Sequence, residues 1–513
     1  MEPNPIFNNI YLFNTLKKEK EIFNPLKKGH VSMYHCGPTV YNFAHIGNLR
    51  AYIATDILRR VFEFNDYSVT QVMNITDIGH LQSDQDDGDD KMTLAIRREN
   101  LPFTLESMKS VANRFYDAFR ADLEELNIRP AHYYPFASDH IEDDILFINY
   151  LLENGNAYAT DDGIYFDTNS IRDYGKLGGV SSGEAGDQVE SRIASADDKG
   201  GVAKIPKRNF RDFAVWKFNS ELGYDAEFGK GFPGWHIECS VMSMKYLGDT
   251  FDIHTGGTDH ISVHHNNEIA QSEAKSGRLL ANYWLHNEHL IIDGGRKMAK
   301  SGESFITLDS VVSHHISPMG FRYWVLGASY RSQLQFSFDA LQQAEQAYQN
   351  LIDKIALIIR QEDEIEGSDE VADGTEGFEH IDDSVQEAVH IDHWTENFTQ
   401  AINNDLDTAS GLAVFHTMLK NPELEASTKI KLIESFDQVF GLELIMIATE
   451  KAKILEAAEN TPIPEEIRQL AEKRLLARQE KNWAESDQIR DEIKMKGFEI
   501  KDEENSYTIS KTI

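Results

Sequence analysis

The segment HVSMYHCGPTVYNFAHIGNLRAYIATDILRRVFEFNDYSVTQVMNITD, residues 30–77, decides the fold class of this chain. Residues 30–40 are an apolar, β-rich run that ends in a Gly-Pro turn, which is typical of a strand. Residues 45–66 carry apolar side chains at helical spacing, and residues 67–77 again have the pattern of a strand. A strand, a helix and a strand within about fifty residues predict a βαβ unit and hence a parallel sheet.

The next part of the chain predicts that this sheet is interrupted. Residues 101–160 are mostly amphipathic helix, and DDGIYFDT (161–168) has the pattern of a strand. We expect that strand to open a smaller insertion. The insertion includes a segment rich in Gly, Ser and Asp at 178–201, which is typical of a long loop.

Sheet-like patterns return at 249–257 and 287–293, each followed by glycines and then by helix. Nearly everything after residue 319 predicts helix, with an acidic linker at 361–380 and a short hairpin at 498–512. The fold class expected is therefore α/β: a Rossmann-like parallel-sheet domain split by an insertion, followed by an all-α C-terminal region that ends in a small domain.

Composition limits the possible function. The chain has 513 residues, which predicts about three domains, and a net charge of −35, which argues against unspecific polyanion binding by its whole surface. The acidic side chains are concentrated: residues 361–410 contain 16 Asp and Glu and no Lys or Arg, whereas residues 461–513 contain 12 against 10 basic ones. We see no signal peptide and no apolar run long enough for a membrane span. Two cysteines in such a chain favour a reducing, cytoplasmic location.

A possible metal site begins with SVHHNNEIA, residues 262–270. His264 and Glu268 are four residues apart in a predicted helix, so both side chains lie on one face. A histidine and a carboxylate are a pair that can bind zinc. The alternative is an exposed polar helix face. His265 points away from that face and has no assigned role.

A possible phosphate site begins with FAHIGNLR, residues 43–50. His45, Gly47 and Asn48 open a helix directly after a strand and a turn, and the amino terminus of a helix attracts phosphate. Gly47 allows a nucleotide to approach the backbone closely. The alternative is that His45 is a helix cap or a surface residue.

A basic loop follows the second half of the sheet. In DGGRKMAKSGES (293–304), Lys297 and Lys300 follow two glycines, so the loop is able to close over a polyphosphate and place two ammonium groups beside it. The alternative is a solvated lysine-rich turn.

Together, HIGN and KMAKS resemble the HIGH and KMSKS signatures of the class I aminoacyl-tRNA synthetases, in the same order. Six segments of the sequence are together similar to the cysteinyl-tRNA synthetases: MYHCGPTVYNFAHIGNLR, MNITDIGH, DFAVWK, PGWHIECS, FDIHTGGTDHISVHHNNEIAQSEA and NNDLDTASGLAV. The resemblance covers nearly the whole chain. It departs at Asn48, where the family signature has a second histidine, and at Ala299, where it has a serine.

The resemblance implies one zinc ion per subunit, held by Cys36, Cys239, His264 and Glu268. In that family the metal binds the thiolate of the substrate cysteine and does not activate water. Such a role is chemically reasonable, because zinc favours a soft thiolate over a hydroxyl. An apolar pocket alone separates cysteine from serine by only about 10- to 200-fold.

The resemblance also implies roles for other residues. Those matched to the cysteine pocket are Thr76, Trp235 and His254, although Trp235 also suits a core and Thr76 a turn. Those matched to ATP are Gly47, Gly256, Gly257, Asp259 and Lys300, with Asp259 on the ribose. Those that stabilise the phosphates are His45, Asn48, Lys297 and Lys300, with Mg²⁺ arriving with ATP.

The implied partners are ATP, L-cysteine and the tRNA of cysteine, for a cytoplasmic monomer without a membrane partner. The domains expected are a catalytic domain in two halves (1–135 and 229–318), a connective insertion (136–228), a helical domain that contacts the tRNA stem (319–445) and an anticodon-binding domain (446–513). In the last of these, the residues chosen from composition as tRNA-facing are Arg474, Arg478, Lys481 and Trp483.

Three other functions compete with this interpretation. A ligase that joins cysteine to an amino sugar would share the metal pocket but would lack the C-terminal helix pair. A non-catalytic RNA-binding paralogue is disfavoured because His45, Lys297, Lys300 and the four metal ligands are present. A zinc hydrolase would need a general base and an open water site, which no motif provides.

Overall fold

The structure is a computed structural model that describes residues 9–78, 91–178, 207–292, 296–297, 305–369, 380–460, 462–502 and 506–511. The chain forms two compact units. The first comprises Met1–Gln346, His393–Thr417 and Gln438–Leu442. The second comprises Ala347–Asp392, Met418–Asp437 and Glu443–Ile513.

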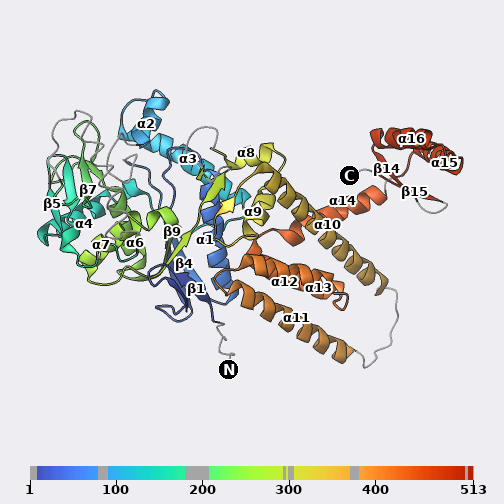
Figure 1. Ribbon diagram of the computed structural model, residues 1–513, viewed down its shortest axis with the longest axis horizontal. Helices are drawn as coiled ribbons and strands as arrows, with labels where there is room; N and C mark the ends of the chain where they lie inside the picture. The colour runs from blue at the N-terminus through green and yellow to red at the C-terminus, as the bar shows by residue number, and fades with distance from the viewer. Residues whose placement is uncertain are drawn as a thin grey trace. The chain divides into compact units, whose positions relative to one another are not determined.

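The first unit is built on a four-stranded sheet in the order β10–β9–β3–β4. Every strand pair in it is parallel. The strands are β3 (His30–His35), β4 (Ser68–Met73), β9 (Phe251–Gly257) and β10 (Ala281–Asn287). Helix α1 (Ile46–Phe64) connects β3 to β4, which confirms the predicted βαβ unit. Figure 1 labels two of the sheet's strands, β9 and β4, together with helix α1.

Helix α1 forms because its apolar residues recur at helical spacing and are buried together. Ile46, Leu49, Ile53, Ile57 and Val61 are all almost fully buried. The remaining helices and the outlying strands of the first half are β1 (Tyr11–Asn14), β2 (Glu19–Ile22), α2 (Lys91–Arg98), α3 (Leu105–Glu125) and α4 (Ile141–Glu153).

The insertion is an antiparallel sheet in the order β5–β6–β7–β8. Its strands are β5 (Ala157–Ala159), β6 (Gly163–Phe166), β7 (Phe213–Phe218) and β8 (Gly231–Pro233). This confirms the predicted strand at 161–168. Most of the expected loop at 178–201 lies outside the described residues. The chain then returns to the central sheet through α6 (Trp235–Leu247), β9 and α7 (His264–Ser276).

A strand is present within the segment predicted at 287–293, as β11 (Leu290–Ile292), but the sequence did not predict the central-sheet strand that precedes it. The central-sheet strand is β10, Ala281–Asn287, which is buried along nearly its whole length and therefore lacks the alternating pattern of a half-exposed strand. The segment after it forms a separate small sheet, in which β11 (Leu290–Ile292) pairs with β12 (Arg296–Lys297) and β13 (Leu334–Gln335).

A buried group of three charged side chains connects α1 to neighbouring segments of the chain. The Asp56 carboxylate lies 2.7 Å from Nε of Arg60 and accepts a hydrogen bond from Nη2 of Arg322 at 2.5 Å. The two guanidinium groups also donate to the backbone carbonyls of Gln438 and Phe440. All three side chains are buried, so this is a compensated ion cluster and not a surface pair.

The chain after residue 305 is mainly helical, as predicted. Its helices are α8 (Leu308–Ser313), α9 (Pro318–Leu326), α10 (Phe338–Asp369), α11 (His380–Ile402), α12 (Thr408–Lys420), α13 (Ala426–Phe440), α14 (Leu444–Glu459), α15 (Glu465–Gln479) and α16 (Trp483–Met495). The predicted terminal hairpin is present as β14 (Phe498–Asp502) and β15 (Tyr507–Lys511). It shares a hydrophobic cluster with α15 and α16 that includes Ile467, Ala471, Ile493 and Phe498.

The first part of the predicted acidic linker, up to residue 369, is helix instead. Helix α10 continues to Asp369, because glutamate and glutamine, which recur in this segment, are good helix formers. Residues 370–379 lie outside the described residues. Among the described helices, none is both long and apolar enough to cross a membrane.

Candidate active site and metal centre

A cavity of about 370 Å³ opens at the carboxyl ends of the central strands. Cys36 follows β3, Asn74 follows β4, Gly256 and Gly257 end β9, and Asn287 ends β10; all five line the cavity. Ligands of parallel α/β sheets bind at this edge, outside the ends of the strands. The fold therefore brings segments that are far apart in sequence to one place.

His45 is the amino-terminal cap of α1 and lines the cavity. Its Nδ1 accepts a hydrogen bond from the backbone N–H of Asn48 at 3.1 Å, and the Asn48 side chain accepts one from the backbone N–H of His45. A neutral imidazole that accepts at Nδ1 carries its proton on Nε2. A Cβ on Gly47 would lie 3.0 Å from the His45 ring, so the glycine leaves room for the ring. The cap thus fixes both the orientation and the tautomer of His45.

The four predicted metal ligands converge beside this cavity. One ligand atom from each of Cys36, Cys239, His264 and Glu268 lies within 4.8 Å of the others. Nε2 of His264 lies 3.0 Å from Oε1 of Glu268, which confirms that the two side chains share one face of α7. Two thiols, an imidazole and a carboxylate are a donor set that could hold a metal ion.

The ionisation of these side chains depends on their contacts with one another. A hydrogen bond from the Cys36 thiol outweighs burial and lowers the pKa of Cys239 to about 6. Burial alone would lower the pKa of His264, but the Glu268 carboxylate and Cys239 raise it to about 10. Burial likewise opposes ionisation of Glu268, yet His254 and His264 hold its pKa well below the usual range. At neutral pH the group contains a thiolate, a carboxylate and a protonated His264, and the imidazole has to release its proton before it can bind a metal ion.

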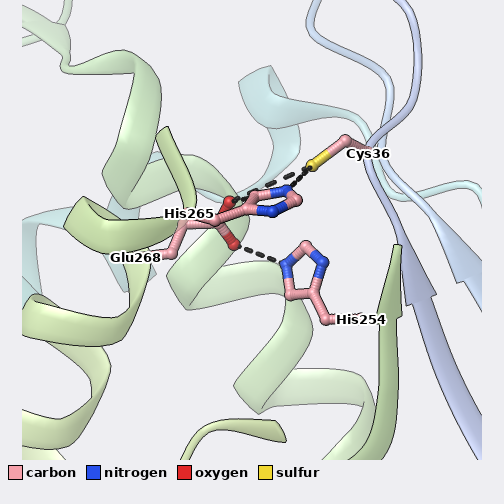
Figure 2. Close-up of side chains that lie close together, drawn as sticks. All are labelled: Cys36, His254, His265 and Glu268. Atoms are coloured by element: carbon pink, nitrogen blue, oxygen red, sulfur yellow. Dashed lines mark hydrogen bonds and ion pairs between the residues drawn. The ribbon is translucent and has the colours of Figure 1, made fainter. Parts of the chain in front are cut away.

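A second group surrounds the same carboxylate. Figure 2 shows Cys36, His254, His265 and Glu268, whose ligand atoms also lie within 4.8 Å of one another. Nε2 of His254 lies 2.8 Å from Oε2 of Glu268, and Nε2 of His265 lies 3.5 Å from Sγ of Cys36. The sequence predicted that His265 points off the helix face of His264 and Glu268 and gave it no role, but in the structure its Nε2 lies 3.9 Å from Oε1 of Glu268. Residues 264–272 of α7 are all buried, so this helix has no exposed face in its first half.

His265 continues into a buried chain of hydrogen bonds that the sequence did not predict. Its Nδ1 lies 2.8 Å from Nε2 of His286, whose Nδ1 lies 2.8 Å from Oγ1 of Thr15. Burial lowers the pKa of both histidines well below its usual value, so both rings are neutral. A signal existed in the sequence, because six of the 19 histidines fall between residues 254 and 289.

The two glycines at the end of β9 permit close packing on both sides. A Cβ on Gly256 would lie 2.6 Å from the ring of His265, and a Cβ on Gly257 would lie 2.4 Å from Oδ1 of Asp259. Asp259 also lines the cavity, and its Oδ1 lies 3.9 Å from Nε2 of His289. The predicted nucleotide-binding segment therefore adjoins the group of histidines directly.

The residues predicted for the cysteine pocket occupy different places. Trp235 lines the cavity, and its ring centroid lies 4.5 Å from that of His264. Thr76 lies behind the wall, where its hydroxyl donates to Oε2 of Glu238 at 3.1 Å. His254 also lies behind the wall, with its ring stacked on that of Trp284. Thr76 thus contacts Asn74, which lines the cavity, and His254 contacts Glu268.

The predicted phosphate-binding lysines are only partly described. β12 pairs the backbone of Lys297 with that of Ile291 in β11. Lys300 and the side chain of Lys297 lie outside the described part of the chain. The roles expected for them stay predictions.

In the second unit, the four residues predicted to face tRNA differ in exposure. Arg474 is 2% exposed and forms an ion pair with Asp502, so it supports the α15–hairpin packing and is not placed to contact an RNA. Arg478 also pairs with Asp502. Lys481 has a positive φ in the turn before α16. Trp483, in contrast, is 58% exposed.

Comparison with known proteins assigns the family. The family described as "tRNA synthetases class I (C) catalytic domain" matches residues 22–346. Cysteine–tRNA ligase 1 of Burkholderia lata is 39% identical over 96% of this chain and 94% of its own. The cysteine–tRNA ligase of Treponema denticola is 38% identical over 98% of this chain and 100% of its own. These matches include the C-terminal helices and do not favour the amino-sugar ligase or the non-catalytic paralogue.

Solved structures agree on the fold. The methionyl-tRNA synthetase of Mycobacterium tuberculosis bound by methionyl-adenylate superposes with a TM-score of 0.52 and 13% identity, over 82% of this chain and 92% of that one. At this identity the likeness concerns the fold alone. The full-length similarity to curated relatives and the catalytic-domain match together show that the chain belongs to the cysteine–tRNA ligases, a family of class I aminoacyl-tRNA synthetases.

Proposed function

We propose that the chain activates L-cysteine with ATP and then transfers the cysteinyl group to the tRNA of cysteine. The carboxylate of cysteine attacks the α-phosphorus of ATP, forming cysteinyl-adenylate and releasing pyrophosphate. A hydroxyl of the terminal ribose of the tRNA then attacks the activated carbonyl carbon, and AMP leaves. The observation that carries the proposal is the convergence of both cysteines, His264 and Glu268 beside the cavity that His45 lines.

We propose zinc as the metal. The donor set fits it, because zinc accepts thiolate, imidazole and carboxylate ligands. Cys36, Cys239, His264 and Glu268 would hold the ion, and His254 would orient Glu268 through the 2.8 Å contact. Bound zinc supplies a soft Lewis acid that prefers the sulfur of cysteine to the oxygen of serine. An apolar pocket alone would separate the two amino acids by only about 10- to 200-fold.

The residues of the chain position the amino acid and the nucleotide. Trp235 offers an apolar wall beside His264. Nε2–H of His45 donates to a phosphate oxygen, and Asn48 keeps the ring in that tautomer through the capping box. Asp259 accepts from ribose hydroxyls, next to Gly256 and Gly257. Gly47 keeps the backbone open to the nucleotide.

The basic loop and the C-terminal region complete the proposal. Lys297 and Lys300 neutralise the charge that develops on the leaving pyrophosphate, with Mg²⁺ brought by ATP. The helical region 319–445 contacts the tRNA stem and 446–513 reads the anticodon, where unstacked bases suit an exposed aromatic such as Trp483. We propose that the enzyme acts as a cytoplasmic monomer.

The first test is ATP–pyrophosphate exchange with purified, zinc-loaded protein. We expect exchange that depends on L-cysteine and that serine does not support. Aminoacylation of the tRNA of cysteine should follow when tRNA is added. Equal exchange with serine, or no exchange with either amino acid, would refute the proposal.

The second test is the metal content of Cys239→Ser, measured by mass spectrometry after dialysis. We expect the bound zinc to fall well below one equivalent, because a serine hydroxyl does not replace a thiolate ligand. Ser243→Ala, in the same helix and also buried, serves as the control and should keep its metal. Unchanged zinc in Cys239→Ser would show that the ligand set is wrong.

A further inference from the structure

Arg50 is a buried arginine whose four hydrogen-bond acceptors are all backbone carbonyls. It lies on α1 a little more than one turn after His45 and is 2% exposed. Its Nη1 donates to the carbonyls of Glu288 and His289, each at 3.0 Å. Its Nη2 donates to the carbonyls of Ser329 at 3.1 Å and Ser332 at 2.6 Å. One guanidinium group therefore joins α1 to two further segments of the chain.

The two segments belong to the small sheet that leads into the basic loop. Glu288 and His289 connect β10 to β11, and Ser329 and Ser332 lie just before β13. β11 pairs with β13 on one side and with β12, which contains Lys297, on the other. Arg50 thus holds the base of the strand pair from which the basic loop begins.

The same turn forms part of the cavity wall. Glu288, His289 and Leu290 all line the cavity. Nε2 of His289 lies 3.9 Å from Oδ1 of Asp259, the residue proposed to bind ribose. A shift of this turn would therefore move both the wall near the nucleotide and the start of the basic loop.

The turn has other attachments, so Arg50 is not needed merely to form it. The backbone N–H of Glu288 donates to the carbonyl of Tyr330 at 2.9 Å. Asp405 in turn accepts from the hydroxyl of Tyr330 at 2.8 Å and lies 2.7 Å from Nε of Arg331. What Arg50 adds is the connection of this assembly to the helix that His45 caps.

We infer that Arg50 is a positioning residue for the activation step. Its side chain holds the 288–289 turn and β11–β12 at a fixed distance from the start of α1, so that His45 and Lys297 act on one nucleotide. The inference rests on the proposed function, because that proposal gives His45 and Lys297 a common substrate.

The chemistry of the side chain explains why an arginine stands here. Its planar fork offers five N–H donors, which can reach carbonyls on two segments at once, whereas lysine offers donors from a single nitrogen. Burial lowers the pKa of Arg50 only to about 10, so the group keeps its charge at neutral pH. Lysine at this position would keep the charge but not the bridge.

The test compares Arg50→Lys with Arg60→Lys. Arg60 lies on the same helix, is also buried and also donates to two backbone carbonyls, of Asn127 and Gln438, neither of which lines the cavity. A misplacement of about 1 Å can cost about 100-fold in rate. We therefore expect Arg50→Lys to lower kcat of cysteine-dependent ATP–pyrophosphate exchange by about 100-fold and to raise the KM for ATP. We expect the KM for cysteine to stay nearly unchanged, and Arg60→Lys to lower thermal stability without this split.

A second measurement is amide hydrogen exchange, read by mass spectrometry on peptides that cover 285–292. We expect faster exchange there in Arg50→Lys and not in Arg60→Lys. Unchanged exchange together with unchanged kcat and KM for ATP would overturn the inference. So would failure of Arg50→Lys to fold while Arg60→Lys folds, since that would assign Arg50 a general structural role. If the wild-type protein shows no cysteine-dependent exchange of pyrophosphate, the proposed function fails. The amide exchange measurement would still test whether Arg50 holds the 288–289 turn in place.

Discussion

His45 has two roles that a pair of substitutions can separate. As the cap of α1, its Nδ1 accepts the backbone N–H of Asn48; as the proposed phosphate ligand, its Nε2–H donates to ATP. Asparagine is one of the best amino-terminal caps, whereas alanine is among the poorest. His45→Asn therefore keeps the cap and removes the imidazole, while His45→Ala removes both.

The magnitudes follow from these two roles. Loss of a side-chain cap costs about 1 kcal/mol of stability, so His45→Ala should be less stable than His45→Asn by about that amount. Both variants lose the same ring packing, and the difference between them isolates the cap. Loss of one preorganised donor to a developing charge costs about 3 to 4 kcal/mol, or about 100- to 1,000-fold in kcat. We expect that loss in both variants.

The assays are urea unfolding followed by circular dichroism and cysteine-dependent ATP–pyrophosphate exchange at saturating ATP. Equal stabilities for the two variants would contradict the role of the cap. A kcat for His45→Asn within about threefold of the wild type, where a lost donor costs at least about 100-fold, would refute the phosphate role and leave His45 as a cap alone.

Three further predictions concern charge, pH and RNA binding. Asp56→Asn leaves two buried guanidinium groups without their carboxylate and should cost about 3 to 5 kcal/mol in urea unfolding, against less than about 1 kcal/mol for Glu63→Gln on the same helix. Burial, with the nearby carboxylates, raises the pKa of Asp122 to about 7, so between about pH 4 and pH 7 the folded protein keeps a proton here that the unfolded chain has released. The free energy of unfolding should therefore fall as the pH rises through this range. Asp122→Asn should lessen that fall, measured as urea midpoints. Trp483→Ala should raise the KM for tRNA and leave pyrophosphate exchange unchanged, whereas Arg474→Ala should chiefly lower the melting temperature of the C-terminal region.

Much of the fold was predictable because its signals are local. The βαβ unit at 30–77 combines β-rich strands with apolar residues at helical spacing, and both patterns survive in the structure. β10 was missed because a strand buried on both faces gives no alternation, and only the apolar segment that follows it, β11 at 290–292, was recognised as a strand. Periodicity alone cannot tell which of two adjacent apolar runs joins the main sheet.

The candidate site was predictable only in part, because pattern arguments assume that a helix has one buried face. The i, i+4 spacing correctly paired His264 with Glu268, but it left His265 without a role, whereas the first half of α7 is buried all round. Arg474 was expected to face tRNA from composition and location alone, although Asp502 compensates its charge inside the structure. Such compensation depends on contacts distant in sequence, which no local pattern records.

Gly256 is a position at which one substitution would affect two parts of the candidate site. It ends β9 in the proposed nucleotide segment, yet the space that its missing Cβ would occupy belongs to the ring of His265, whose Nε2 lies 3.5 Å from Sγ of Cys36. A single added methyl group would disturb the proposed nucleotide segment and the group around Cys36 together. Under the proposed function, affinity for the nucleotide and affinity for the metal would therefore be coupled at this position, and a variant selected for one would carry a change in the other.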